Sequence, residues 1–322
     1  MTKNIIVETP SRLHFTLIDL NGESGRIDGG IGAAIASPPY KIKVGISNRN
    51  DFSPDVKTII ELMRKGVRIK NKYKIEIINS IPEHSGLGSK TQLSLAVAVA
   101  VSKLEGYSYT PRELARIVHR GGTSGIGLAA FEHGGFILDA GHSVKEKKDF
   151  LPSHYSNTSP PPVIFRQELP KDWYFVLMTL KINNRIYGKT EKEIFQKFCP
   201  IPKKEVEKLS RLILMKTIPA ILEKDIELFG ESLTEIQGIG FKRIENKCQK
   251  WDIKDVYRFL DKEGVFGRGL SSFGPTIYAI TKGKKNAIEL SDNIADYCKD
   301  VKIDGSVTYS NARNTGARIY DG

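Results

Sequence analysis

The sequence has few cysteines and no long apolar segment. Its three cysteines, Cys199, Cys248 and Cys298, lie far apart and match neither a metal-binding spacing nor a disulfide framework. We interpret all three as structural residues of a protein kept in a reducing compartment. No uncharged apolar run reaches the roughly 18 residues of a membrane-spanning helix. The N-terminus enters strand-like sequence without a signal-peptide pattern, so we expect a cytoplasmic protein with no membrane partner.

Acidic residues are also in short supply. The 322-residue chain has 37 Asp and Glu against 49 Lys and Arg, which gives a net charge of +12. Such a charge permits nucleic-acid binding and equally suits a polyanionic small substrate. The basic residues are spread along the chain, and no aromatic and basic RNA signature is present, which disfavours a nucleic-acid partner. The length indicates one large domain or two medium ones.

A glycine-rich stretch, Ile81 to Gln92, is the strongest local signal. Residues 74–79 before it alternate between apolar and polar side chains, as in a half-buried strand, and residues 89–104 after it form an apolar run without Pro or Gly. A turn therefore leads directly into the N-terminus of a buried helix. It is not a Walker A loop, because Ser89 occupies the position where that motif has a glycine before its lysine.

This turn has the chemistry of an anion site. Gly86 and Gly88 allow a ligand to approach the backbone closely. The sequence predicts free amides at Ser89, Lys90 and Thr91, which together with the helix dipole favour a phosphate. Lys90 adds a full positive charge. The alternative is a tight turn followed by a helix that Ser89 caps.

Two further glycine-rich turns occur later in the chain. Arg120 to Gly135 enters a helix, and Gly264 to Ile280 enters a strand. Other strands are predicted at 3–9 and 12–18 around Pro10, 29–35, 40–47, 136–139, 173–180, 306–310 and 315–320. Other helices are predicted at 55–66, 111–119, 203–217, 219–237, 253–263 and 285–299. Residues 141–162 are predicted to be an ordered active-site loop or an interdomain connection. This order of elements favours an α+β sandwich over a Rossmann fold.

The three turns together resemble the GHMP small-molecule kinase superfamily. Pro82 to Gln92 is similar to the phosphate loop of that family, Ser124 to Gly135 to its central motif, and Gly269 to Ala279 to its C-terminal motif. The resemblance implies an α+β fold with two domains. Residues 1–162 would resemble the second domain of ribosomal protein S5, and residues 163–322 would be ferredoxin-like.

One departure from the kinases points to a non-kinase branch. The kinase aspartate that polarises the acceptor hydroxyl falls on Gly127, and glycine cannot act as a base. The stretches Ser11–Gly22, Arg26–Gly32 and Ser85–Gln92 resemble the β-ribofuranosylaminobenzene 5'-phosphate synthases of methanopterin biosynthesis. That resemblance implies phosphoribosyl diphosphate and either 4-aminobenzoate or 4-hydroxybenzoate as substrates. It also implies a C-riboside 5'-phosphate, CO2 and diphosphate as products, with archaeal relatives.

Residue roles follow from this chemistry. His14, with a pKa near neutrality, is a candidate proton acceptor, and Asp19 and Asp28 are candidates to stabilise the reacting carbon or to bind Mg²⁺, the expected cofactor. Arginines are assigned to phosphate oxygens, because an arginine on the carboxylate would oppose decarboxylation. The candidate phosphate- and substrate-binding residues are Arg12, Arg26, His84, Ser85, Gly86, Gly88, Ser89, Lys90, Thr91, Arg120, Ser124, Ser271 and Ser272.

Alternatives remain for each role and for the function. His14 can be a structural strand residue, the arginines can form fold-stabilising ion pairs, and the aspartates can be turn residues bonded to their own backbone. His133 is expected at a helix C-terminus, and Asp139, at the end of a strand, is a plausible site residue. The alternative functions are an ATP-dependent small-molecule kinase and a basic RNA-binding protein. The family resemblance implies a homodimer, and no metal ligand is assigned.

Overall fold

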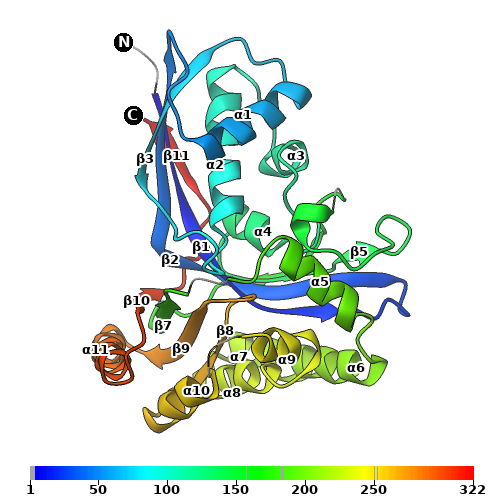
Figure 1. Cartoon of the computed structure of the whole chain (residues 1–322), viewed down its shortest axis with the longest axis vertical. Coiled ribbons are helices and arrows are strands. Elements are labelled where there is room, and N and C mark those ends of the chain that lie inside the picture. The colour runs from blue at the N-terminus through cyan, green and yellow to red at the C-terminus, as the bar shows by residue number, and fades with distance from the viewer. Residues whose placement is uncertain (1–3, 157, 183–184, 250, 252) are drawn as a thin grey trace.

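The computed structural model describes residues 4–156, 158–182, 185–249, 251 and 253–322, which form two sheets flanked by helices (Figure 1). The first sheet contains β1 (Asn4–Asp19), β2 (Arg26–Ser47), β3 (Lys72–Asn79), β4 (Phe136–Asp139), β5 (His142–Ser143), β6 (Val163–Gln167) and β11 (Arg318–Asp321). Its order is β11-β1-β2-β4-β6, and β3 and β5 also pair with β2. The second sheet contains β7 (Trp173–Leu180), β8 (Gly267–Leu270), β9 (Thr276–Lys282) and β10 (Gly305–Asn311) in the order β10-β7-β9-β8.

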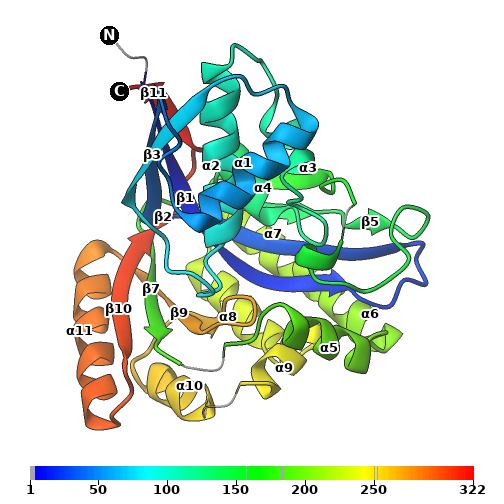
Figure 2. The same cartoon turned by 45° about the horizontal axis from the view of Figure 1, so that its top comes forward.

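The β1–β2 hairpin is longer than the sequence predicts. The predicted break at Pro10 is wrong, because the strand continues through this residue. A register shift between Thr9 and Ser11 places Pro10, which has no N–H, where the ladder requires no hydrogen bond from it. In the same way β2 joins the two predicted strands at 29–35 and 40–47 through residues that pair with no part of β1. The far end of the hairpin extends beyond the neighbouring strands of the first sheet and lies over the C-terminal helices in both Figure 1 and Figure 2.

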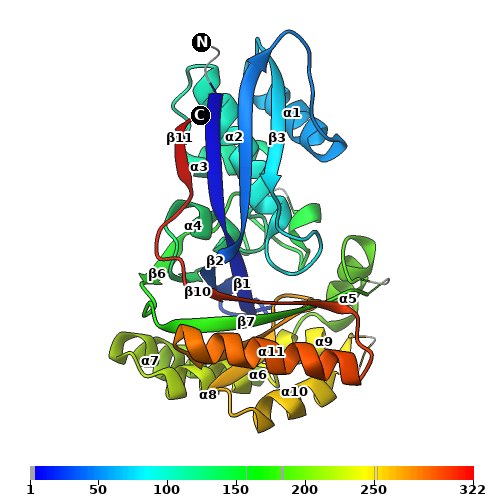
Figure 3. The same cartoon turned by 90° about the vertical axis from the view of Figure 1, so that its left-hand side faces the viewer.

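Four helices cover one face of the first sheet (Figure 3). They are α1 (Pro54–Gly66), α2 (Ser89–Leu104), α3 (Pro111–Ile117) and α4 (Ile126–Glu132). Helix α2 is the central one and contacts both β1 and β2, as its uninterrupted run of Ala, Val and Leu predicts. Helix α3 begins with a capping box between Thr110 and Glu113, and α4 ends at Glu132 with His133 as its C-cap, in agreement with the predicted helix start and the predicted place of His133.

The second half of the chain is richer in helices than predicted. The helices are α5 (Lys189–Phe198), α6 (Lys203–Leu212), the π-helix η2 (Ile213–Thr217), α7 (Ile218–Glu223), α8 (Ile226–Ile236), α9 (Gly240–Lys247), α10 (Ile253–Lys262) and α11 (Lys284–Asp300). The single helix predicted at 219–237 is wrong, because Lys224 adopts a positive φ of 60° and separates α7 from α8. Helices α5 and α9 and strand β6 were not predicted.

The second sheet confirms the predicted fold class. Its strands follow the chain order β7, β8, β9, β10, with α11 between β9 and β10, and its spatial order is that of a ferredoxin-like domain. Figure 3 shows α11 lying along β7 and β10. The fold is therefore the α+β architecture with an S5-like first unit and a ferredoxin-like second unit. The boundary after residue 162 stays a prediction, since β6 and β11 both pair within the first sheet.

A shared aromatic core joins the two units. Phe15 on β1 lies 6.3 Å from Phe136 of the first unit and 5.3 Å from Tyr278 of the second, measured between ring centroids. Phe229 on α8 packs edge-on against Phe15 as well. These buried rings hold β1 between the units, so the side chains on its polar face have a fixed position at their junction. Among the described residues, no helix is long and apolar enough to cross a membrane.

Candidate active site

A polar pocket of about 380 Å³ lies where the three glycine-rich turns meet β1, α5 and α9. It brings together most of the residues that the sequence predicts for ligand binding. Those that line it are Arg12, His14, His84, Gly86, Gly88, Ser89, Lys90, Thr91, Arg120, Ser124 and Ser272. The three turns, which lie far apart in sequence, thus serve one cavity.

The first turn places the N-terminus of α2 at this pocket. Gly86 and Gly88 have φ values of +81° and +85°, which L-residues rarely adopt. Gly88, and not Ser89, is the N-cap residue. The prediction of a free amide is wrong for Thr91, whose N–H donates to the Gly88 carbonyl oxygen at 3.1 Å. Ser89 and Lys90 keep the first two positions of the helix, where amides have no partner within the helix.

Arg12 holds this turn against β1. Its Nη1 donates to the Gly86 carbonyl oxygen at 2.5 Å, and its backbone N–H donates to the Leu87 carbonyl oxygen at 3.0 Å. A Cβ at Gly88 would lie only 2.9 Å from Cγ of Arg12, so a glycine is required there. Burial lowers the pKa of Arg12 to about 10, which leaves the guanidinium charged at neutral pH.

The third turn closes the other side of the pocket. The Ser271 hydroxyl donates to the Gly86 carbonyl oxygen at 2.7 Å and accepts from the His14 backbone N–H at 3.1 Å. The Ser272 N–H donates to the His14 carbonyl oxygen at 3.0 Å. Ser85 donates to the Pro82 carbonyl oxygen at 2.6 Å. The hydroxyls of Ser85 and Ser271 are therefore engaged in holding the turns together, whereas Ser272 lines the cavity.

His14 is the buried imidazole of the pocket, with 5% of its surface exposed. Its Nε2 lies 3.1 Å from the Ser124 hydroxyl, and its Nδ1 has no hydrogen-bond partner among the described residues. Burial lowers the pKa of His14 well below its usual value, and the charges of Arg12 and Lys242 lower it further. The ring is therefore neutral at physiological pH.

Two carboxylates of the pocket were missed by the sequence analysis. Glu191 on α5 has its pKa raised to about 7 by burial and by the charge of Glu245. Glu245 on α9 forms a buried ion pair with Lys242, whose Nζ also donates to the carbonyl oxygens of Leu270 at 3.1 Å and Ser272 at 3.3 Å. In the sequence, Lys242 and Glu245 resemble an ordinary surface pair at i and i+3, and α5 was not predicted at all.

His84 and Arg120 lie at the edges of the polar pocket. The His84 ring stacks on Tyr187 with 4.0 Å between centroids, and burial lowers its pKa. Arg120 Nε donates to the Ser94 hydroxyl at 3.3 Å, and burial lowers its pKa too. Ser153 and Tyr155 of the short helix η1 (Ser153–Tyr155) also line the cavity. The 141–162 segment therefore contributes to the site, as one of its two predicted roles requires.

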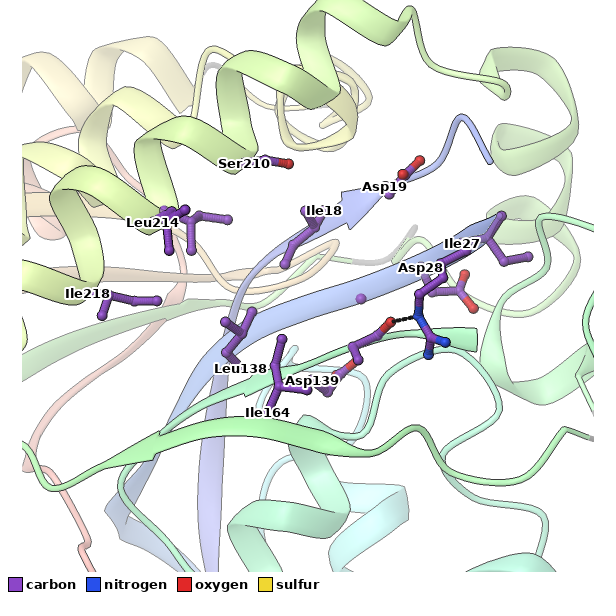
Figure 4. A pocket seen from close by; sticks show the side chains of 14 residues that line it. Ile18, Asp19, Ile27, Asp28, Leu138, Asp139, Ile164, Ser210, Leu214 and Ile218 are labelled. Atoms are coloured by element: carbon purple, nitrogen blue, oxygen red, sulfur yellow. Dashed lines mark hydrogen bonds between the residues drawn. The ribbon is translucent and has the colours of Figure 1, made fainter. Parts of the chain in front are cut away.

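Three predicted residues, Asp19, Arg26 and Asp28, lie outside the polar pocket. They line a second, largely apolar pocket of about 320 Å³, where Ile18, Leu138, Ile164, Leu214 and Ile218 gather (Figure 4). Arg26 donates to the carbonyl oxygens of Ala140 at 2.8 Å and Gly141 at 2.7 Å. Asp19 accepts from the N–H groups of Asn21 and Gly22. The Asp19 contacts match the alternative of a turn residue bonded to its own backbone, whereas Arg26 holds distant backbone carbonyls and forms no ion pair with any described residue.

The Asp28 carboxylate belongs to a buried cluster. Its Oδ2 lies 2.6 Å from His142 Nδ1 and 2.8 Å from Lys147 Nζ. His142 Nε2 contacts the Ser159 carbonyl oxygen at 3.0 Å, and Lys147 also donates to the Gly122 carbonyl oxygen at 3.0 Å. These bonds tie the 141–162 segment to the second glycine-rich turn, so the cluster supports the wall of the polar pocket from behind.

No group of three or more His, Cys, Asp and Glu residues within the described part of the chain is arranged to hold a metal ion. This is compatible with Mg²⁺, which commonly binds through one or two carboxylates together with substrate phosphates and water. In the polar pocket, Glu191 is a carboxylate that forms no ion pair with any described residue. Glu191 and the hydroxyl of Ser89 are oxygen donors that fit this role.

Comparison with known proteins gives a family for the chain. Residues 55–135 match the model of the GHMP kinases N terminal domain, and residues 217–300 match that of the GHMP kinases C terminal domain. Solved structures with this fold include a homoserine kinase from Cytophaga hutchinsonii. That kinase has a TM-score of 0.67 at 16% identity, with 98% of this chain and 97% of the kinase covered. A mevalonate diphosphate decarboxylase from Enterococcus faecalis has a TM-score of 0.62 at 14% identity, with both chains fully covered.

Closer sequence relatives carry one name. The β-ribofuranosylphenol 5'-phosphate synthase of Methanothermobacter thermautotrophicus is 45% identical, with 98% of this chain and 99% of the relative covered. The synthase of the same name from Methanocaldococcus jannaschii is 42% identical, with 98% of this chain and the whole relative covered. The predicted resemblance is thereby confirmed: the chain belongs to the β-ribofuranosylphenol 5'-phosphate synthase family, an enzyme family within the GHMP kinase superfamily.

Proposed function

We propose that the protein transfers the 5-phosphoribosyl group of phosphoribosyl diphosphate to 4-hydroxybenzoate, with loss of CO2 and diphosphate, in methanopterin biosynthesis. Attack by 4-hydroxybenzoate followed by loss of its carboxylate leaves a ribosylphenol, the kind of product that the relatives' name states. This favours 4-hydroxybenzoate over 4-aminobenzoate. The enzyme would thus be a ribosyl-phosphate transferase with small-molecule substrates, and we expect a homodimer.

One observation carries the proposal against the kinase alternative. A Cβ at Gly127 would lie 3.1 Å from Cγ2 of Thr91 and 3.5 Å from its Oγ1, so the Thr91 side chain already occupies the space in front of Gly127. The position of the kinase aspartate therefore has no base, and a side chain there would have to displace Thr91. The pocket instead presents His14, a neutral buried imidazole with one unpartnered nitrogen.

The leaving diphosphate is assigned to the N-terminus of α2. The amides of Ser89 and Lys90, the Lys90 ammonium and the Arg12 guanidinium lie on this side of the pocket, where they would stabilise the charge that develops as the bond to C1 of the ribose breaks. Magnesium, when bound, supplies further neutralisation of the diphosphate, and Glu191 and Ser89 would hold it. Arg120 and Ser272 remain available for the 5-phosphate or the ribose hydroxyls.

His14 is assigned to the acceptor. In this assignment its Nδ1 accepts the phenol proton while the ring carbon that bears the carboxylate attacks C1 of the ribose. The C1–O bond breaks, and its electron pair leaves with the diphosphate. Loss of CO2 then returns an electron pair to the ring, and the proton returns from His14 to the phenolate. A neutral imidazole suits this role, because an imidazolium has no lone pair to accept with.

The direct test measures CO2. The protein is incubated with magnesium, phosphoribosyl diphosphate and carboxyl-labelled 4-hydroxybenzoate, with labelled 4-aminobenzoate in parallel and the ribosyl donor omitted as a control. Donor-dependent release, faster with 4-hydroxybenzoate, is expected, and EDTA should abolish it. Release with neither benzoate would contradict the proposal. ADP formed from ATP with an alcohol panel would then support the kinase.

A further inference from the structure

A chain of three side chains runs from the polar pocket into the protein. His14 Nε2 lies 3.1 Å from the Ser124 hydroxyl, and that hydroxyl donates to Oδ2 of Asp139 at 3.4 Å. The three residues come from separate elements, namely β1, the turn before α4 and the end of β4. Asp139 was only a plausible site residue in the sequence, and the proposed function gives it no role.

The surrounding backbone fixes this arrangement. The N–H of Gly125 donates to Oδ2 of Asp139 at 2.9 Å, and the N–H of Gly141 donates to its Oδ1 at 2.9 Å. A Cβ at Gly30 would lie 3.3 Å from His14 Nε2 and 3.6 Å from Asp139 Oδ2, so this glycine leaves the space between them open. Asp139 is 1% exposed, and His14 is 5% exposed. The His14 and Asp139 side chains are therefore shielded from water, whereas Ser124 between them is only partly buried.

The hydroxyl of Ser124 carries a single proton, so the chain of hydrogen bonds has a direction. When Asp139 is ionised it can only accept, so Ser124 donates to Asp139 and the ring of His14 must donate from Nε2 to Ser124. This tautomer leaves Nδ1 unprotonated. When Asp139 is protonated and donates, the directions reverse, and the ring carries its proton on Nδ1. Nδ1 is buried and has no partner among the described residues, so the protonation of this nitrogen is set by the direction of the chain and not by a competing hydrogen bond.

We propose that Asp139, acting through Ser124, sets the tautomer of His14 and thereby keeps Nδ1 unprotonated and able to accept the phenol proton. This inference rests on the proposed function for its chemical consequence, but the tautomer itself can be measured without turnover. Asp139 and Ser124 are positioning residues in this scheme. Ser124, which the sequence suggests for phosphate binding, is engaged instead with His14 and Asp139.

The pKa of Asp139 places the change of the His14 tautomer in the neutral pH range. Burial raises the pKa of Asp139 to about 7, although the Gly141 and Gly125 amides favour its ionised form; the neighbouring charge of Asp28 raises this pKa further, and His142 lowers it. The pKa of His14 lies well below its usual value through burial and the charges of Arg12 and Lys242, so the ring does not become an imidazolium in this range. Between pH 6 and 8, ionisation of Asp139 therefore changes the tautomer of His14 and not its charge.

The tautomer is read from two-bond ¹H–¹⁵N spectra of protein labelled with ¹⁵N-histidine. The chain has six histidines, and His14→Gln identifies the signal of His14. We expect the Nδ1–H form to predominate at pH 5.5 and the Nε2–H form at pH 8.5. A single tautomer across this range would overturn the proposal, as would a transition from neutral ring to imidazolium.

Two variants test the origin of the change. Asn at position 139 cannot titrate, so Asp139→Asn should abolish the transition whichever way its amide is oriented. Ser124→Ala interrupts the chain and leaves the carboxylate in place, so it should also abolish the transition, and it decides the question if Asp139→Asn fails to fold. A transition that survives Ser124→Ala would overturn the inference.

Turnover supplies a second, separate readout. In the wild type, kcat should rise with pH around the same midpoint, and Ser124→Ala should remove that dependence and leave KM for the ribosyl donor unchanged. A transition by NMR in a protein without donor-dependent CO2 release would leave the tautomer control standing and remove its assigned role. Release without the transition would keep the proposed function and overturn the inference.

Discussion

Two buried histidines lie near the second glycine-rich turn, and they differ in how many of their ring nitrogens are paired. His142 is 1% exposed, and both of its ring nitrogens have protein partners: Asp28 at 2.6 Å and the Ser159 carbonyl oxygen at 3.0 Å. His14 is 5% exposed, and only Nε2 has a partner. A buried polar atom without a partner costs stability, and Nδ1 of His14 carries this cost next to the polar pocket. The two side chains are both buried, but only His142 has partners at both ring nitrogens, so we expect the two histidines to have different roles.

The largest expected effect is a loss of activity on substitution of His14, which substitution of His142 should not cause. In His14→Gln, the side-chain amide can keep a contact with Ser124 but cannot accept a phenol proton as an imidazole does. We expect kcat/KM to fall by about 10²- to 10⁴-fold, the usual contribution of a positioned general base. Chemical denaturation should show a nearly unchanged free energy of unfolding. Turnover close to that of the wild type would exclude His14 as the proton acceptor.

The same substitution at the other histidine should act on stability. His142→Gln breaks a buried cluster and removes one of the two partners of Asp28 Oδ2, which should lower the free energy of unfolding by about 3 kcal/mol. The folded fraction should keep the turnover of the wild type within a few-fold. Denaturant titration and the CO2 assay measure the two quantities. A large loss of turnover in fully folded His142→Gln would break the comparison and place this cluster in the reaction.

Sequence reasoning found the turns because their signal is local. Glycines at 86 and 88 followed by an unbroken apolar helix predict a glycine turn that opens a buried helix, and the structure has that turn, while its binding of phosphate stays a prediction. Sequence reasoning did not predict Glu191 as a site residue, because nothing in its charged segment indicates that this segment packs over a pocket formed by β1 and α9. For the same reason the sequence could not separate His14 from the aspartates of the hairpin, whose partners lie over 100 residues away or on the turn itself.

A matched pair of glycines tests whether the phosphate loop is held by shape. Gly88 and Gly106 have φ values of +85° and +82°, but a Cβ at Gly106 would meet nothing within 4 Å, whereas one at Gly88 would meet Arg12. Each Gly→Ala change should cost about 1–2 kcal/mol of stability from the left-handed backbone. Gly88→Ala should in addition weaken binding of phosphoribosyl diphosphate about tenfold, measured by calorimetry, because it displaces Arg12. Equal donor affinity in both variants would show that the contact is unimportant.

The smallest expected effect is the loss of stability that results from burying the Glu191 carboxylate in the pocket. The pKa of Glu191 is raised to about 7 from an ordinary value of 4.5, so the folded protein binds more protons than the unfolded chain between these values, and its stability falls as pH rises through this window. Glu191→Gln cannot ionise. It should therefore match the wild type at pH 4.5 and exceed it by about 1–2 kcal/mol at pH 8, by denaturant titration without ligands.

The same variant should lose activity at pH 8 while it gains stability, because the carboxylate assigned to magnesium is gone. The ordinary surface acid Glu207 on α6, changed to Gln, is the control and should show no such dependence on pH. If the stability advantage of Glu191→Gln over the wild type is no larger at pH 8 than at pH 4.5, this carboxylate is already compensated in the free enzyme. In that case His14 would be the one group of the pocket, among those discussed, that lacks a partner. The contrast with His142 would then depend on Nδ1 of His14 alone.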